Sequence, residues 1–212
     1  MLRERITVTL EPDLVAAIDT LVDRQTLRNR SHAIEHLLKE GIGLHQLEQA
    51  FLFFEEGWTT NQLEAILQLC KPLSIQRFFI CLPSSQTAQA QELAAQIQSQ
   101  NYEAISVPAD FGSGGAIILQ KERLTNPFLI FWLGPTLAVP QSLLPAYVFH
   151  RQHHSLLTRL LAPIGQDGFQ SAGIDIAQPE LISHIPVGLT SLKETVFPAL
   201  AKESKIRGYV TD

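Results

Sequence analysis

The sequence has few cysteines, no long uninterrupted apolar run and no excess of positive charge, and each absence excludes a class of protein. Its two cysteines, Cys70 and Cys81, lack the spacing of zinc sites and indicate buried thiols in a reducing compartment. The most apolar stretch, residues 127–144, is interrupted by Pro135 and Pro140, so no membrane span is expected. The formal net charge of −5 excludes a protein that coats nucleic acid over its whole surface. We therefore expect a cytoplasmic protein without metal or other cofactor, in which any DNA contact is local.

The N-terminal residues alternate between apolar and polar, as in a short amphipathic strand over residues 5–10. One face carries Ile6, Val8 and Leu10. The other carries Arg5, Thr7 and Thr9. The chain is 45% hydrophobic, and its 212 residues accommodate such a small module beside a larger domain.

Two helices are expected to follow this strand. Pro12 suits the first turn of a helix that continues to Arg24, and Asn29 can cap a second helix that ends near Gly41 and Gly43. The residues expected to face inward are Leu14, Ile18, Leu21, Val22, Ala33, Ile34, Leu37 and Leu38. A strand and two helices in some forty residues cannot bury their own apolar faces, and a single strand leaves its backbone donors unpaired. The module must therefore pair with a partner.

Residues 3–43 resemble the ribbon-helix-helix superfamily of CopG, MetJ and Arc-like repressors. In that family two chains pair their strands into an antiparallel ribbon that enters the major groove of DNA. The resemblance implies a homodimer that reads bases with Arg5, Thr7 and Thr9, whose guanidinium, hydroxyl and methyl groups suit base edges. The alternative is a solvated strand face in a module that only dimerises.

The same resemblance implies a phosphate site at the start of the second helix, where free backbone amides suit a DNA phosphate. Its residues are Arg28, Asn29, Arg30 and Ser31. Residues 1–45 hold six Lys or Arg and seven Asp or Glu side chains, a formal net charge of −1. This charge argues against strong binding of DNA.

The rest of the chain predicts an α/β domain. We expect residues 1–44 to form the module, 45–60 a helical connector and 61–212 the larger domain. The apolar side of the connector is expected to carry Leu47, Phe51, Leu52 and Phe54. Helices are expected at 60–70, 86–99, 114–123, 141–153, 179–185 and 191–202. Strands are expected at 76–82, 104–107, 127–133, 156–161, 172–176 and 206–210. Such alternation favours a mostly parallel sheet with helices on its faces.

The order KPLSIQRFFICL, FGSGGAIIL, NPFLIFWLGPT, AYVFHRQHHSLLTRLL and FQSAGIDIAQPELISHIPVGLTSLKETVFPAL resembles the sugar-1-phosphate nucleotidyltransferases over residues 62–212. The resemblance implies a truncated Rossmann-like domain. The family's glycine-rich strand and arginine-bearing loop are missing, and we expect the N-terminal module to replace them.

Other catalytic groups of that family are also missing. Pro135 follows Gly134 where the family has a magnesium-binding aspartate, and the chain stops before a second one. Ser171 replaces an asparagine, and the glutamate-lysine segment expected between Leu161 and Phe169 is absent. Nucleotidyl transfer depends on such charges, so we expect a domain without catalytic activity.

Two motifs in this domain suggest ligands. Gly112, Ser113, Gly114 and Gly115 match the family's glycine-rich loop, which implies a site for a nucleotide or sugar nucleotide; the alternative is a loop that packs a helix against the sheet. His150, His153 and His154 have a spacing that can gather a transition metal. No carboxylate or thiol accompanies them in sequence, and we expect no metal site.

These inferences together predict a homodimeric, sequence-specific DNA-binding regulator, not an enzyme, whose larger domain senses a ligand or mediates further assembly. One alternative is a scaffold protein that uses the module only to dimerise. Another is a residual enzyme acting on a nucleotide sugar.

Overall fold

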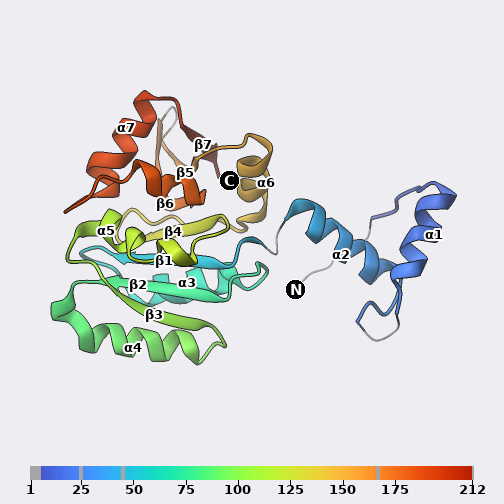
Figure 1. Cartoon of the computed structure of the whole chain (residues 1–212), viewed down its shortest axis with the longest axis horizontal. Coiled ribbons are helices and arrows are strands. Elements are labelled where there is room, and N and C mark those ends of the chain that lie inside the picture. The colour runs from blue at the N-terminus through green and yellow to red at the C-terminus, as the bar shows by residue number, and fades with distance from the viewer. Residues whose placement is uncertain (1–5, 24–25, 44–45, 166–167, 212) are drawn as a thin grey trace. The chain divides into compact units, whose positions relative to one another are not determined.

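The computed structural model describes residues 6–23, 26–43, 46–165 and 168–211 (Figure 1). The chain divides into two compact units, Met1–Leu44 and His45–Asp212.

The first unit contains two helices, α1 (Pro12–Leu21) and α2 (Arg30–Ile42). Both confirm the sequence prediction, although α1 ends at Leu21. The Asn29 side chain caps α2 by accepting a hydrogen bond from the His32 backbone N–H at 3.0 Å. The expected strand does not form in the described residues 6–10. The strand is absent because its backbone N–H and C=O groups need a partner strand, and a single copy of the module offers none.

The apolar face of this unit is left largely uncovered. Of the eight residues expected to face inward, only Ile18 and Ala33 are buried. Leu38 is 60% exposed, and Ile6 and Val8 of the N-terminal segment are 76% and 59% exposed. One copy of the unit therefore lacks a complete core.

The second unit is built on one seven-stranded sheet in the order β3-β2-β1-β4-β6-β5-β7. Its strands are β1 (Gln49–Phe54), β2 (Arg77–Leu82), β3 (Glu103–Pro108), β4 (Phe128–Leu133), β5 (Leu157–Ile164), β6 (Gly168–Ala177) and β7 (Ile206–Val210). Only β6 runs antiparallel to its neighbours. The mostly parallel sheet predicted from the sequence is confirmed.

The prediction of a helical connector over residues 45–60 is wrong. Residues Gln49–Phe54 form β1, which pairs with both β2 and β4 near the middle of the sheet. A parallel strand covered on both faces is a continuous apolar run. Over only six residues, such a run also fits the apolar side of a helix. The expectation that the module replaces the domain's first strand is corrected by the same finding. The loop after β1 carries two acidic residues, Glu55 and Glu56.

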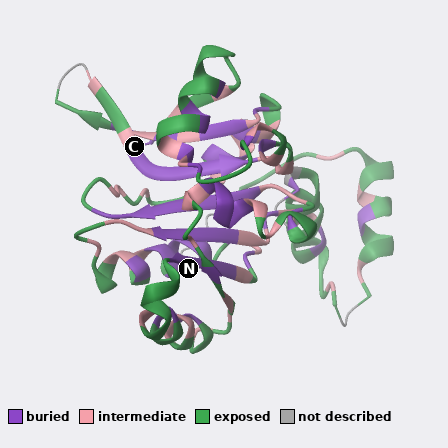
Figure 2. Cartoon of the chain, turned by 60° about the vertical axis from the view of Figure 1, so that its left-hand side comes forward, coloured by how far each residue is buried: buried purple, intermediate pink, exposed green. Residues whose placement is uncertain are grey.

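Helices cover both faces of the sheet. They are α3 (Thr60–Cys70), α4 (Thr87–Gln98), α5 (Gly112–Ile118), α6 (Leu144–Gln152) and α7 (Phe197–Lys202). Shorter turns are η2 (Ser84–Gln86), η3 (Lys121–Arg123), η4 (Pro179–His184) and the π-helical η5 (Leu192–Val196). Figure 2 shows the strands as mostly buried and the helices as exposed on their outer sides.

An aromatic cluster forms the core on the face covered by α5, η4, η5 and α7. The Phe51 ring stacks on Phe79 with centroids 4.6 Å apart, and Phe53 stacks on Trp132 at 4.8 Å. Both cysteines are buried and free, as expected, and burial raises the pKa of each thiol. In the part of the chain that the structure describes, no helix is long and apolar enough to cross a membrane.

Candidate functional site

A surface hollow of about 710 Å³ lies at the N-terminus of α2. Its lining includes all four residues predicted to hold a DNA phosphate, Arg28, Asn29, Arg30 and Ser31. All four are exposed. The amides of the first turn of a helix have no partner within the helix, so the hollow presents donors beside cationic side chains.

Arg30 is also a structural residue. Its guanidinium donates two hydrogen bonds of 2.5 Å to the Asp19 carboxylate, which joins α2 to α1. The pKa of Asp19 lies below its ordinary value because Arg30 donates these hydrogen bonds. No acid in the described part of the chain pairs with Arg28, so Arg28 is the freer of the two cations.

The predicted base-reading residues lie on the N-terminal segment. Thr7 and Thr9 are exposed, which leaves their hydroxyl and methyl groups available. Arg5 lies outside the described residues. The base-reading role of all three stays a prediction.

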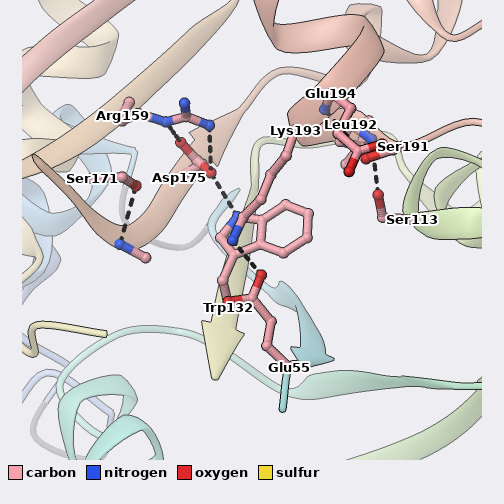
Figure 3. A network of polar contacts seen from close by, with 11 residues as sticks. Glu55, Ser113, Trp132, Arg159, Ser171, Asp175, Ser191, Leu192, Lys193 and Glu194 are labelled. Atoms are coloured by element: carbon pink, nitrogen blue, oxygen red, sulfur yellow. Dashed lines mark hydrogen bonds and ion pairs between the residues drawn. The ribbon is translucent and has the colours of Figure 1, made fainter. Parts of the chain in front are cut away.

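In the second unit, charged residues gather at the carboxyl end of the central strands (Figure 3). Lys193 forms an ion pair with Glu55, and its Nζ lies 4.5 Å from the centroid of the Trp132 ring. The Trp132 Nε1–H donates to the buried Asp175 at 2.8 Å, and Arg159 donates to the same carboxylate at 2.8 Å. We call these five residues the sheet-edge network. The network satisfies each of its charges with an opposite charge from the same unit.

A cavity of about 270 Å³ lies beside the network, lined by Thr136, Arg159, Gln170, Ser171 and Lys193. Both of its cations are already paired with carboxylates, so the cavity suits a small polar ligand held by the hydroxyl and amide groups of Thr136, Gln170 and Ser171. Arg159, Asp175 and Lys193 are not among the site residues predicted from the sequence. One available signal was Asp175, since an aspartate inside an apolar strand must find a partner when buried.

The glycine loop packs against the chain's own backbone. The Gly114 N–H donates to the Thr190 carbonyl at 2.9 Å, and the Ser113 hydroxyl accepts a hydrogen bond from the Leu192 N–H at 2.9 Å. Gly112 has a φ of +76°, and a Cβ added to it would lie 2.5 Å from the Thr190 carbonyl oxygen. Gly114 and Gly115 are buried. This geometry favours the packing role; nucleotide binding at Gly112–Gly115 stays a prediction.

The three histidines of α6 and its C-terminus do not converge. His150 is fully buried, with Nδ1 2.9 Å from the Thr158 hydroxyl and Nε2 2.9 Å from the Gln178 amide nitrogen. His153 instead packs on Phe149, with ring centroids 4.3 Å apart. No group of three or more His, Cys, Asp or Glu side chains within the described ranges could hold a metal ion.

The sequence of the first unit is similar to a known family. Residues 4–44 match the model of the ribbon-helix-helix protein, copG family. The match covers the N-terminal segment, α1 and α2 of the ribbon-helix-helix module, and indicates a role in DNA binding or dimerisation. A comparison with curated proteins finds no match.

The second unit has the fold of nucleotidyltransferases. A Bacillus anthracis protein described as a glucose-1-phosphate thymidylyltransferase, solved with sucrose, aligns with a TM-score of 0.56 and 11% identity over 78% of this chain and 87% of its own. The inositol-1-phosphate CTP transferase from T. maritima aligns with a TM-score of 0.52 and 9% identity over 78% and 86%. Likeness at such low identity shows a shared fold alone.

Proposed function

We propose that this protein is a homodimeric, sequence-specific DNA-binding regulator that acts in the cytoplasm. The exposed apolar face of the ribbon-helix-helix module carries this proposal. Ile6, Val8 and Leu38 are each more than half exposed in one copy, and pairing with a second copy would remove them from water.

Pairing also fixes the orientation of the polar face. Side chains alternate along a strand, so burying Ile6 and Val8 between two modules turns Thr7 and Thr9 to the opposite side. Arg5, Thr7 and Thr9 would then read bases in the major groove, while the hollow at the α2 N-terminus binds a flanking phosphate.

The second unit, in this proposal, does not catalyse nucleotidyl transfer. Pro135 cannot ligate magnesium, and the Glu55 carboxylate after β1 would repel a triphosphate. Lys193 is already held by Glu55. The cavity beside it, lined also by Thr136, Gln170 and Ser171, is instead suited to sensing a small polar ligand.

Selection from a random DNA library with the purified protein tests the proposal. We expect enrichment of a roughly palindromic site, because a two-fold dimer binds two half-sites. Arg5→Ala combined with Thr7→Ala should weaken binding to that site by about tenfold or more, since one good base contact contributes about 1–3 kcal/mol. Lys39→Ala is the matched control, because it removes a cation from the same module at the far end of α2.

Two outcomes would reject the proposal. One is a selection without enrichment above background at moderate salt, which would favour the scaffold alternative, a module that only dimerises. The other is unchanged affinity in the double variant. Release of pyrophosphate from a triphosphate and a sugar phosphate would show that the second unit is an enzyme.

A further inference from the structure

A basic pocket of about 320 Å³ lies where β5 and β7 begin. Five of its lining side chains can carry positive charge, and two, those of Ser155 and Ser204, offer a hydroxyl group. We call the five basic residues and the buried Ser155 the basic pocket; the basic residues are His153, His154, His184, Lys205 and Arg207.

The basic pocket is separate from the sheet-edge network. β5 and β7 run parallel, with Leu157 paired to Ile206, so their amino ends lie side by side. β4 and β5 are both antiparallel to β6 and therefore parallel to each other. The pocket thus lies at the amino edge of the sheet, whereas Glu55 and the loop after β4 lie at the carboxyl edge. Open α/β sheets bind nucleotides at the carboxyl edge, so this pocket is not their ordinary site.

Positive charge exceeds negative charge around the pocket. Lys205 pairs with Glu203 at 2.6 Å. The pKa of Glu203 is lowered mainly by the hydrogen bond from Lys205, with a smaller contribution from His184. Arg207 pairs with no acid in the described part of the chain. A concave surface of this composition attracts anions.

Ser155 supplies an independent observation. Its residue is only 4% exposed, and its hydroxyl oxygen is buried without a hydrogen-bond partner among the described residues. Buried polar groups are nearly always paired, so an orphaned hydroxyl at a basic pocket indicates a partner other than the residues that the structure describes. A serine hydroxyl can donate to an anionic oxygen.

We propose that the basic pocket binds a small phosphate-bearing anion, either inorganic phosphate or a phosphomonoester. A phosphate offers several acceptor oxygens around one centre, which matches several donors that three segments of the chain bring to one pocket. Arg207 provides a planar pair of donors, Lys205 a second charge, and Ser155 a neutral hydrogen bond. The volume accommodates a phosphate with a small organic group. This binding does not depend on the proposed DNA contacts.

Calorimetric titration of the full chain with inorganic phosphate, and then with a phosphomonoester such as AMP, tests the proposal at constant ionic strength. Lys205→Gln combined with Arg207→Gln should weaken binding of both by about tenfold or more, because charge-assisted hydrogen bonds are lost. Lys121→Gln combined with Arg123→Gln likewise removes one lysine and one arginine charge, but from η3, outside the pocket. This control should leave the affinity for phosphate unchanged. Ser155→Ala should weaken binding by a few fold, without lowering the unfolding temperature of the protein measured without phosphate.

The outcomes are distinct. Tighter binding of AMP than of phosphate supports a phosphomonoester, and equal affinity supports free phosphate. No heat of binding in the unmodified protein, or equal losses in both double variants, overturns the proposal. It is also overturned if Lys205→Gln with Arg207→Gln weakens only DNA binding, because the cations would then contact DNA. Unchanged affinity in Ser155→Ala contradicts the role of the hydroxyl.

Discussion

His150 is a neutral imidazole in the folded protein. With the Gln178 amide donating to Nε2, the ring proton is on Nδ1 and is donated to the Thr158 hydroxyl. Burial, with a smaller contribution from the Arg151 charge, lowers the pKa of His150 from 6.5 to about 4. His150, whose spacing from His153 and His154 resembles a metal-binding motif, is therefore a core residue.

This pKa predicts acid sensitivity. Between pH 6.5 and pH 4 the unfolded state binds a proton that the folded state does not, so the free energy of unfolding falls as the pH falls through this window. The loss is on the order of 3 kcal/mol for a shift of this size. Urea denaturation at pH 7 and pH 4.5 should show a larger loss in the natural protein than in His150→Gln, which cannot titrate. Equal losses in the two proteins would contradict the assignment.

Asp175 makes a second prediction at this scale. Its carboxylate is fully buried and accepts hydrogen bonds from Trp132 and Arg159. Asp175→Ala removes one partner of a mostly buried pair and should lower the free energy of unfolding by about 3 kcal/mol. Glu103→Ala breaks the exposed ion pair with Arg77 and should cost less than about 1 kcal/mol. Chemical denaturation compares them; similar effects would count against a structural role for Asp175.

Among the elements, the helices and strands of the second unit follow closely from the sequence because their apolar periodicity is local. β4, for example, is expected at 127–133 and found at Phe128–Leu133. β1 was missed since five of its six residues are apolar, on both faces, and carry no period that separates strand from helix. The sheet-edge network could not be predicted, because Glu55 and Lys193 are 138 residues apart and only the sheet order brings them together.

The glycine loop is the element whose two interpretations differ in a measurable way. A Cβ added at Gly114 would lie 2.8 Å from Ile185 Cγ2 and 3.0 Å from Thr190 Cγ2. Gly114→Ala should therefore cost about 1–3 kcal/mol of unfolding free energy without any nucleotide present. Gly41→Ala in α2 is the control, because nothing lies within 4 Å of its added Cβ, and it should be neutral or stabilising by up to about 1 kcal/mol. A Gly114→Ala protein of normal stability but lower nucleotide affinity would favour the nucleotide interpretation instead.

At the scale of the whole molecule, the two units differ in how complete they are. The second unit buries an aromatic core between its sheet and helices, whereas the ribbon-helix-helix module buries only Ile18 and Ala33 of its expected apolar face. Its resemblance to a family of paired strands was readable from about forty residues. The pairing itself requires a second copy of the module, so the structure of one chain does not contain it.

This difference predicts which surface would hold the proposed dimer together. Leu38 on α2 and Leu119 beside α5 are 60% and 53% exposed, so Leu38→Asp and Leu119→Asp place the same charge on similarly exposed positions of the two units. Leu38→Asp should dissociate the dimer, because an unpaired carboxylate in a buried interface is strongly unfavourable. Sedimentation velocity should then find a monomer of about the chain mass of 23.6 kDa, while Leu119→Asp remains dimeric. If Leu119→Asp instead yields the monomer and Leu38→Asp does not, the second unit forms the dimer and the strands of the module are not paired.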